Sequence, residues 1–183
     1  VRYLTNASSG QMGQALCRAS VDAGHEVVVV TGPVAIDYPE SATVIPVVST
    51  EEMLATARSE FASCDGLIGV AAPCDYRPDF VAEQKISKTG APLVLHLVET
   101  PDIVATLGAE KGDRWVVGFA LETDDHRFRA IAKLHRKRCD LIVLNDPSAM
   151  DSQFNQVELL NPAGDVVLRA SGSKLHVARQ IFE

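Results

Sequence analysis

Short runs rich in valine, isoleucine and leucine recur along the 183-residue chain and alternate with segments of helical periodicity. Continuous apolar runs of this kind are typical of strands that are buried on both faces of a sheet. We expect such strands at 26–31, 65–71, 93–98, 115–119 and 140–145, with a further strand at 43–47. In the segments between them, apolar residues recur every three or four positions. This periodicity predicts helices at 9–23, 51–61, 102–109 and 126–138.

The C-terminal region has a different pattern. Residues 156–160 and 166–169 flank the turn-forming sequence Asn161-Pro162-Ala163-Gly164, which suits an antiparallel hairpin, and a final helix is expected at 174–182. Upstream, the alternation of strands and helices predicts a parallel sheet with helices on its faces. The predicted fold class is therefore α/β, a three-layer Rossmann-like sandwich with a mostly parallel sheet and an antiparallel hairpin near the C-terminus.

Bulk composition narrows the class of protein. With 46% hydrophobic and 22% charged residues, the chain can form one domain, 1–183, with a sizeable core. The formal net charge of -7 argues against nucleic acid as a partner. No apolar run approaches the roughly 20 residues that span a bilayer, so no membrane partner is expected. The sequence predicts a soluble, cytoplasmic protein.

Cysteine and histidine spacing gives no sign of a metal site. The four cysteines form no C-x-x-C pair, and His25, His96 and His176 are scattered through different predicted elements. Neither a zinc site nor a disulfide framework follows from such spacing. We expect reduced, mostly structural thiols. Cys74 is not expected to be a nucleophile, because no histidine is placed in the sequence to activate it.

Polar segments follow several of the predicted strands. Ligands of open α/β sheets bind beyond the carboxyl ends of the strands, where this chain has 72–78, 120–123 and 146–147. The segment 5–13 places asparagine, serine and glycine ahead of a helix, which suits an anion. The alternative for this segment is an ordinary capped helix.

Lysines supply further candidates for anion binding. Lys85 and Lys88 lie in a predicted loop, although surface lysines before a turn are common. Lys133 and Lys137 are one helical turn apart in the basic helix 126–138, so both ammonium groups can point toward a polyanion such as a triphosphate. The alternative is a solvated basic face that nearby aspartates balance.

Taken together, these segments resemble the phosphopantothenoylcysteine synthetase family in order, spacing and most residue identities. The resemblance covers nearly the whole chain. Its main carriers are Tyr3-Leu4-Thr5-Asn6, Ser8-Ser9-Gly10, Met12-Gly13, Thr31-Gly32-Pro33-Val34, Asp75-Tyr76-Arg77-Pro78, Lys85-Ile86, Pro101-Asp102-Ile103, Val117-Gly118-Phe119-Ala120, Asp140-Leu141-Ile142 and Asn145-Asp146.

The resemblance implies a ligase of coenzyme A biosynthesis. In this family the carboxylate of 4'-phosphopantothenate attacks the α-phosphate of CTP in the presence of Mg²⁺, and cysteine then takes the acyl group from the acyl-cytidylate. The resemblance also implies a homodimer and, in bacteria, a fused N-terminal flavin-dependent decarboxylase. Family domains open with a central strand before the position that matches Val1. Because the chain starts without an initiator Met, we expect that strand to precede it.

Carried over by position, the resemblance implies a role for each of several residues. Asn6 and Lys85 would be catalytic. The nucleotide would contact Gly69, Val70, Ala71, Asp75, Lys85, Pro101, Asp102, Ile103, Val104, Phe119, Lys133 and Lys137. The acyl substrate would contact Asn6, Ser8, Ser9, Gly10 and Ala72, and no metal ligand is implied. The alternatives are a helix cap for Asn6, a turn-forming carboxylate for Asp75 and a core aromatic for Phe119.

The chain departs from the family pattern at positions near this site. Gln11 replaces a lysine, Pro73-Cys74 replaces small apolar residues, and Glu99-Thr100 replaces a basic residue followed by asparagine. These departures bear on phosphate affinity and pocket shape. Two other functions stay open: an NAD(P)-dependent Rossmann oxidoreductase, although G-x-G-x-x-G and Tyr-x-x-x-Lys are absent, and a non-catalytic dimeric assembly module. The choice between CTP and ATP also stays open.

Overall fold

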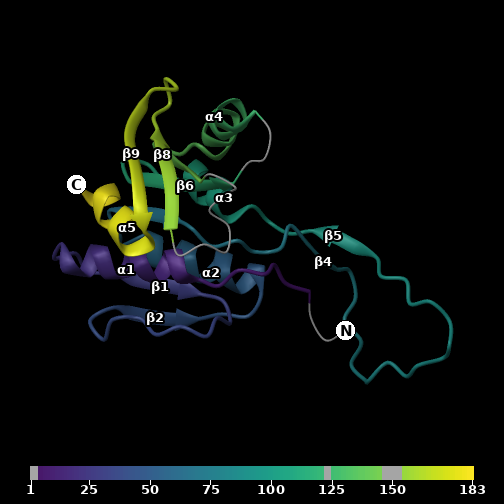
Figure 1. Ribbon diagram of the computed structural model, residues 1–183. Coiled ribbons are helices and arrows are strands. Elements are labelled where there is room, and N and C mark those ends of the chain that lie inside the picture. Colours follow the sequence, from purple (N-terminus) through teal and green to yellow (C-terminus); the bar gives the residue numbers. More distant parts are fainter. Residues whose placement is uncertain (1–3, 122–124, 146–153) are drawn as a thin grey trace.

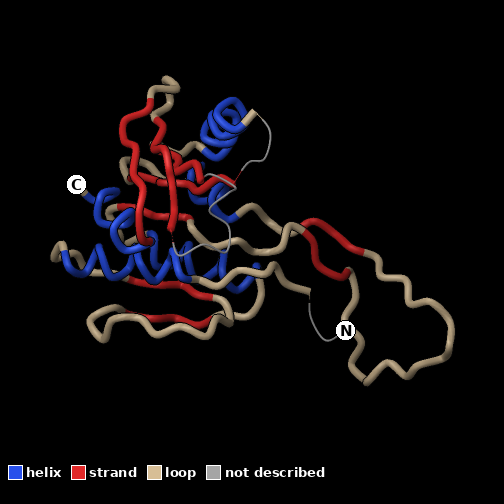
Figure 2. Tube along the Cα trace, viewed as in Figure 1, coloured by secondary structure: helices blue, strands red, loops and turns tan. Residues whose placement is uncertain are grey.

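The computed structural model describes residues 4–121, 125–145 and 154–183 (Figures 1 and 2). Its helices are α1 (Gln11–Asp22), α2 (Thr50–Phe61), α3 (Ile103–Ala109), α4 (His126–Lys137) and α5 (Lys174–Phe182). Its strands are β1 (Val28–Thr31), β2 (Thr43–Pro46), β3 (Gly66–Gly69), β4 (Tyr76–Pro78), β5 (Leu97–Glu99), β6 (Trp115–Leu121), β7 (Leu141–Asn145), β8 (Phe154–Leu160) and β9 (Val166–Ser173). None of the helices in these ranges is long and apolar enough to cross a membrane.

The largest sheet is mixed. Its strand order is β3-β6-β7-β8-β9, in which β3, β6 and β7 are parallel and β8 and β9 pair antiparallel. β1 and β2 form a separate parallel pair, and β4 and β5 a separate antiparallel pair. The α/β class and the C-terminal hairpin are confirmed. A mostly parallel sheet is not confirmed, and the Rossmann-like layering and the strand before Val1 remain predictions.

The expected strand at 93–98 is wrong. Only 97–99 form a strand there, and it pairs with β4 outside the main sheet. Residues 76–99 form an arm that projects from the body in Figures 1 and 2. The apolar side chains of this run therefore cover no face of the main sheet, and Val94 is 73% exposed.

Alternate residues of β6 and β7 supply two apolar cores, because successive side chains of a strand point to opposite faces. Val116 joins Leu107 of α3 and Leu134 of α4 in one core. Val117 joins Val177 of α5 in the other. Helices α3 and α4 therefore pack against one face of β6, and α5 packs against the other.

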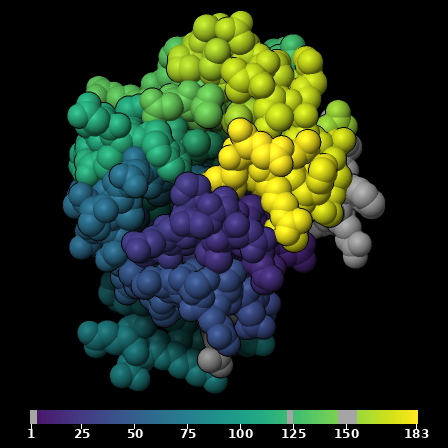
Figure 3. Space-filling view, turned by 90° about the vertical axis from the view of Figure 1, so that its left-hand side faces the viewer, coloured from purple at the N-terminus to yellow at the C-terminus, as the bar shows by residue number. Residues whose placement is uncertain are grey.

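Helix α1 runs beside α5, as Figure 3 shows for the purple and yellow surfaces. Leu16 and Ala178 are buried in the contact between them. At the start of α1, a side chain added at Gly13 would meet Val70, which directly follows β3, at 3.5 Å. The first turn of α1 therefore lies at the carboxyl end of β3, the edge where the sequence predicts a ligand.

Candidate functional site

Asn6 connects the segment before α1 to the segment after β3. Its side-chain Nδ2 donates to the carbonyl oxygens of Ala72 at 3.2 Å and Pro73 at 3.1 Å. The helix-cap alternative for Asn6 is wrong, because the N-cap of α1 is Gly10 and the Asn6 amide group bonds to Ala72 and Pro73 instead. The structure thus brings together two segments that are 66 residues apart in sequence.

Gly10 gives the first turn of α1 its shape. Its φ of 72° lies in the left-handed region that favours glycine, and a Cβ there would lie 2.8 Å from Ile36. The exposed residues Ser8 and Ser9 precede it, and the Ser8 amide donates to the Asn6 carbonyl at 2.9 Å. The amides of a helix start can receive an anion, so this turn suits an acidic group.

The residues expected to hold the nucleotide divide into two groups. A Cβ at Gly69 would lie 2.4 Å from Val104 Cγ2, so β3 and the first turn of α3 are in close contact. Ile103 and Val104 pack toward the α3 and α4 core. Val70 and Phe119 instead pack with the α1 and α5 cluster. The structure therefore places Phe119 partly in the core, as its structural alternative expected.

Asp102 links α3 to α4. Its Oδ1 caps α3 by accepting from the Ala105 amide at 3.0 Å, and it also accepts from Lys137 Nζ at 3.0 Å. Burial raises the pKa of Asp102, but the Ala105 amide and Lys137 outweigh it, and the pKa lies below its usual value. The Lys137 ammonium is therefore held at the start of α3, next to Pro101.

The other predicted lysines lie in different settings. Lys133 is on α4, one turn before Lys137. Lys85 is exposed on the arm between β4 and β5, and no hydrogen bond or ion pair within the described part of the chain involves it. Between these two described residues, Lys85 and Asn6, the structure therefore shows no hydrogen bond.

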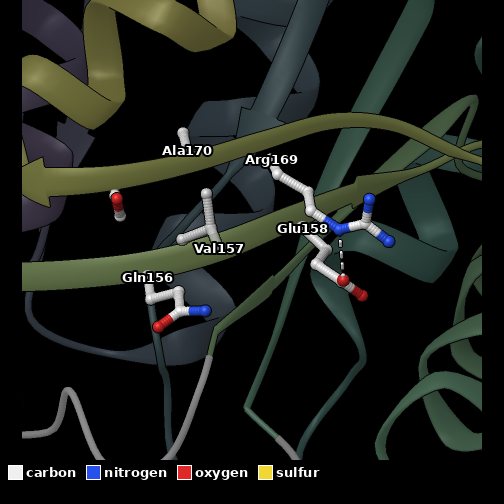
Figure 4. A pocket seen from close by; sticks show the side chains of 6 residues that line it. Gln156, Val157, Glu158, Arg169 and Ala170 are labelled. Carbon is white, nitrogen blue, oxygen red and sulfur yellow. Dashed lines mark hydrogen bonds and ion pairs between the residues drawn. The ribbon is translucent and has the colours of Figure 1, made fainter.

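A hollow of about 150 Å³ lies elsewhere, on the hairpin (Figure 4). It is lined by Gln156, Val157, Glu158, Arg169, Ala170 and Ser171. Glu158 accepts two hydrogen bonds from Arg127 at 2.7 Å and one from Arg169 at 3.0 Å. The charged groups in this hollow are thus paired with one another, and none was expected in the site.

The cysteines are free thiols in the structure, with Cys17 and Cys139 buried. Burial raises the pKa of Cys139 to about 11. Its thiol is therefore protonated near neutral pH and is a poor nucleophile. These observations agree with structural thiols at both positions.

Sequence reasoning missed the role of Thr100. In the sequence Thr100 is only a departure from the family pattern, but in the structure its hydroxyl donates to the Cys74 carbonyl at 2.6 Å. It also missed Gly108, where a Cβ would lie 2.0 Å from the Lys137 carbonyl oxygen. A glycine inside a helix was the signal for close packing there. The segments after β6 and β7, including Glu122 and Asp146, lie outside the described residues.

Comparison with known proteins supplies the family. A family model for the DNA/pantothenate metabolism flavoprotein C-terminal domain matches residues 1–183. The chain is 39% identical to the coenzyme A biosynthesis bifunctional protein CoaBC of Vibrio vulnificus strain YJ016, a match that covers 100% of this chain and 47% of that protein. It is 40% identical to the CoaBC protein of Bacillus subtilis strain 168, over 84% of this chain and 38% of that protein.

A solved structure agrees with these matches. The C-terminal domain of a coenzyme A biosynthesis bifunctional protein CoaBC superposes with a TM-score of 0.85 at 34% identity, covering 100% of this chain and 84% of that chain. The chain spans less than half the length of the two curated relatives. The family model and the solved structure therefore identify the same C-terminal domain.

Proposed function

Because the chain belongs to the DNA/pantothenate metabolism flavoprotein C-terminal domain family, we propose that it joins 4'-phosphopantothenate to cysteine with consumption of CTP, in coenzyme A biosynthesis. The observation that carries the proposal is the hydrogen bonding of Asn6 to Ala72 and Pro73. It joins the segment expected to handle the acyl group to the segment expected to hold the nucleotide.

The proposed reaction has two steps. A carboxylate oxygen of 4'-phosphopantothenate forms a bond to the α-phosphorus of CTP, and the bond from that phosphorus to the β-phosphate oxygen breaks, releasing pyrophosphate. The cysteine nitrogen then attacks the acyl carbon and loses a proton, and CMP leaves with the former carboxylate oxygen. Activation is needed because oxide is a poor leaving group, whereas a nucleotide monophosphate leaves readily.

Asn6 would act on the acyl side of this reaction. Its two amide hydrogens are directed at the Ala72 and Pro73 carbonyls, so its side-chain oxygen is the group left to face a substrate. An amide oxygen accepts a hydrogen bond without competing for a proton. It therefore fits an incoming amine better than it fits a carboxylate.

Lysines would act on the phosphate side. Lys137 is held beside Pro101 by Asp102, and Lys133 lies one turn away on the same helix. Cations positioned near phosphate oxygens offset the charge that develops during phosphoryl transfer. Lys85 would reach the phosphates by movement of the arm, as loops that close over substrates do.

Magnesium would accompany the triphosphate. Mg²⁺ is usually bound through substrate phosphates and one or two carboxylates, and it would neutralise charge on the phosphate oxygens when bound. Within 4–121, 125–145 and 154–183, no group of three or more His, Cys, Asp or Glu residues is arranged to hold a metal. Among these described residues, the donor set therefore fits a metal that is carried mainly by the phosphates of the nucleotide.

The proposal includes a cytoplasmic homodimer. Its support is the arm, on which Phe80, Val81 and Val94 are 74%, 78% and 73% exposed. Apolar side chains gathered on one projecting segment mark a contact surface. The curated relatives are named bifunctional proteins, so the proposal also includes a fused flavin-dependent decarboxylase.

Pyrophosphate release tests the function. The natural protein would be given 4'-phosphopantothenate, Mg²⁺ and either CTP or ATP, and we expect release that requires phosphopantothenate and favours CTP. Lys85→Gln should slow release by about 10²- to 10³-fold, by analogy with other positioned donors. Arg129→Gln, which changes an exposed basic residue of α4, serves as the control and should stay near the wild-type rate. A folded protein that releases no pyrophosphate with either nucleotide contradicts the proposal and favours an assembly module.

A further inference from the structure

The loop at residues 72–75 has a donor at each of its successive carbonyl oxygens. Asn6 Nδ2 donates to Ala72 and Pro73 at 3.2 and 3.1 Å. Thr100 supplies the other two donors, its hydroxyl to Cys74 at 2.6 Å and its amide to Asp75 at 2.9 Å. Asn6 therefore holds the first half of the loop, and Thr100 holds the second half.

Thr100 lies where the arm returns to the body. It directly follows β5, whose residues are exposed, and it is itself partly buried. The next residues are Pro101 and Asp102, and Asp102 caps α3 and holds Lys137. Figure 1 shows β4 and β5 at the base of the arm, with α3 following them. Thr100 is thus hydrogen-bonded to the loop that carries Asp75 and directly precedes Pro101 in the sequence. Both are parts of the proposed nucleotide site.

We propose that Thr100 is a positioning residue for the nucleotide, which holds the loop carrying Asp75 in register with Pro101 and the start of α3. This inference rests on the proposed ligase function. Its physical basis is that a partly buried carbonyl loses its donor when the hydroxyl is removed. Displacement of binding groups by about 1 Å is enough to weaken the productive complex.

The test separates the hydroxyl from the shape of the side chain. Thr100→Val removes the hydroxyl with nearly the same volume and keeps the amide that bonds Asp75, whereas Thr100→Ser keeps the hydroxyl. Thr106→Val is the matched control, because the Thr106 hydroxyl donates to Asp102 within its own helix at 2.8 Å. Each variant of the natural protein would be compared in thermal unfolding and in the KM for CTP and for 4'-phosphopantothenate.

We expect Thr100→Val to raise the KM for CTP about tenfold, with the KM for 4'-phosphopantothenate unchanged within about twofold. Thr100→Ser should restore the KM for CTP, and Thr106→Val should leave it unchanged. An unchanged KM for CTP in Thr100→Val, or an equal rise for both substrates with a fall in Tm, overturns the positioning role and leaves the ligase proposal intact. A wild-type protein that consumes no nucleotide overturns both.

Discussion

The side chain of Asn6 faces two carbonyl oxygens, so it must present donors to both. Asn6→Asp would replace the donating NH₂ by an oxygen about 3 Å from these carbonyls. Repulsion should displace loop 72–75, and we expect the rate of product formation to fall about 10²-fold, with little change in Tm because the residue is exposed. Steady-state assays with coupled detection of pyrophosphate measure this loss. If the Asn6→Asp variant forms product within twofold of the wild-type rate, the hydrogen bonds from Asn6 to Ala72 and Pro73 do not contribute to catalysis.

The sequence pattern predicts which residues belong to the site, but it does not predict which of them contact one another. The order and spacing of motifs placed Asn6, Gly69 and Val104 in one family pattern, and the structure brings Gly69 against Val104. The bonds from Asn6 and Thr100 to loop 72–75 join residues that are far apart in sequence. Periodicity and propensity describe neighbours along the chain, so they could not have shown either bond.

Helices α3 and α4 touch at Gly108. A Cβ there would lie 2.0 Å from the carbonyl oxygen of Lys137, so Gly108→Ala must push the helices apart. Alanine is favoured over glycine within a helix by about 1 kcal/mol, but overpacking should dominate and lower the free energy of unfolding by about 1–3 kcal/mol. The KM for CTP should rise as well, because Lys137 moves with α4.

Gly13→Ala is the control for this prediction. Gly13 also lies in a helix, but a Cβ there meets Val70 at an ordinary 3.5 Å. We expect it to be neutral or stabilising by up to about 1 kcal/mol. Urea unfolding of both variants gives the comparison, and equal stability of the two proteins would contradict the close contact between α3 and α4.

Glu158 connects the first turn of α4 to the hairpin. Hydrogen bonds from Arg127, and after them from Arg169, lower the pKa of Glu158 below its usual value. A carboxylate with a lowered pKa stabilises the folded state above its unfolded pKa of about 4.3, and that contribution is lost as pH falls through the folded pKa. We expect Glu158→Gln to lower the free energy of unfolding at pH 7 by about 1 kcal/mol or less, because the arginines are exposed.

Urea unfolding of wild type and Glu158→Gln between pH 7 and pH 3 measures this dependence. The difference between the two proteins should be constant near neutrality and shrink as pH falls below the unfolded pKa of about 4.3 and through the lower folded pKa. A difference that keeps the same size at the acid end would mean that charge on Glu158 does not contribute.

Apolar runs predicted strands correctly where the run is also buried in the folded protein. The apolar runs of β6 and β7 are buried on both faces, and both strands were predicted. The run at 93–98 is also rich in leucine and valine but lies on the arm, where tertiary structure rather than local sequence decides its exposure. The mixed sheet arises from β8 and β9, whose turn sequence was the signal for an antiparallel pair.

The shape of the whole molecule predicts how it assembles. If a second copy covers the arm, then Phe80→Glu should place a charge in the interface and raise the dimer Kd by at least about tenfold. Phe128→Glu is the control, since Phe128 on α4 is 78% exposed and Phe80 is 74% exposed. Sedimentation at several concentrations distinguishes the outcomes. A monomeric wild type, or equal weakening by both variants, would argue against a dimer through the arm.

An oxygen label shows directly whether the nucleotide activates the carboxylate. The natural protein would be given 4'-phosphopantothenate labelled with ¹⁸O at both carboxylate oxygens, together with CTP, Mg²⁺ and cysteine. Mass spectrometry would then measure the ¹⁸O content of the CMP and of the amide product. Attack of the carboxylate on the α-phosphorus predicts one ¹⁸O in each CMP and one ¹⁸O retained in the amide product. CMP without label would mean that the nucleotide is hydrolysed by water, and it would contradict acyl activation by this protein.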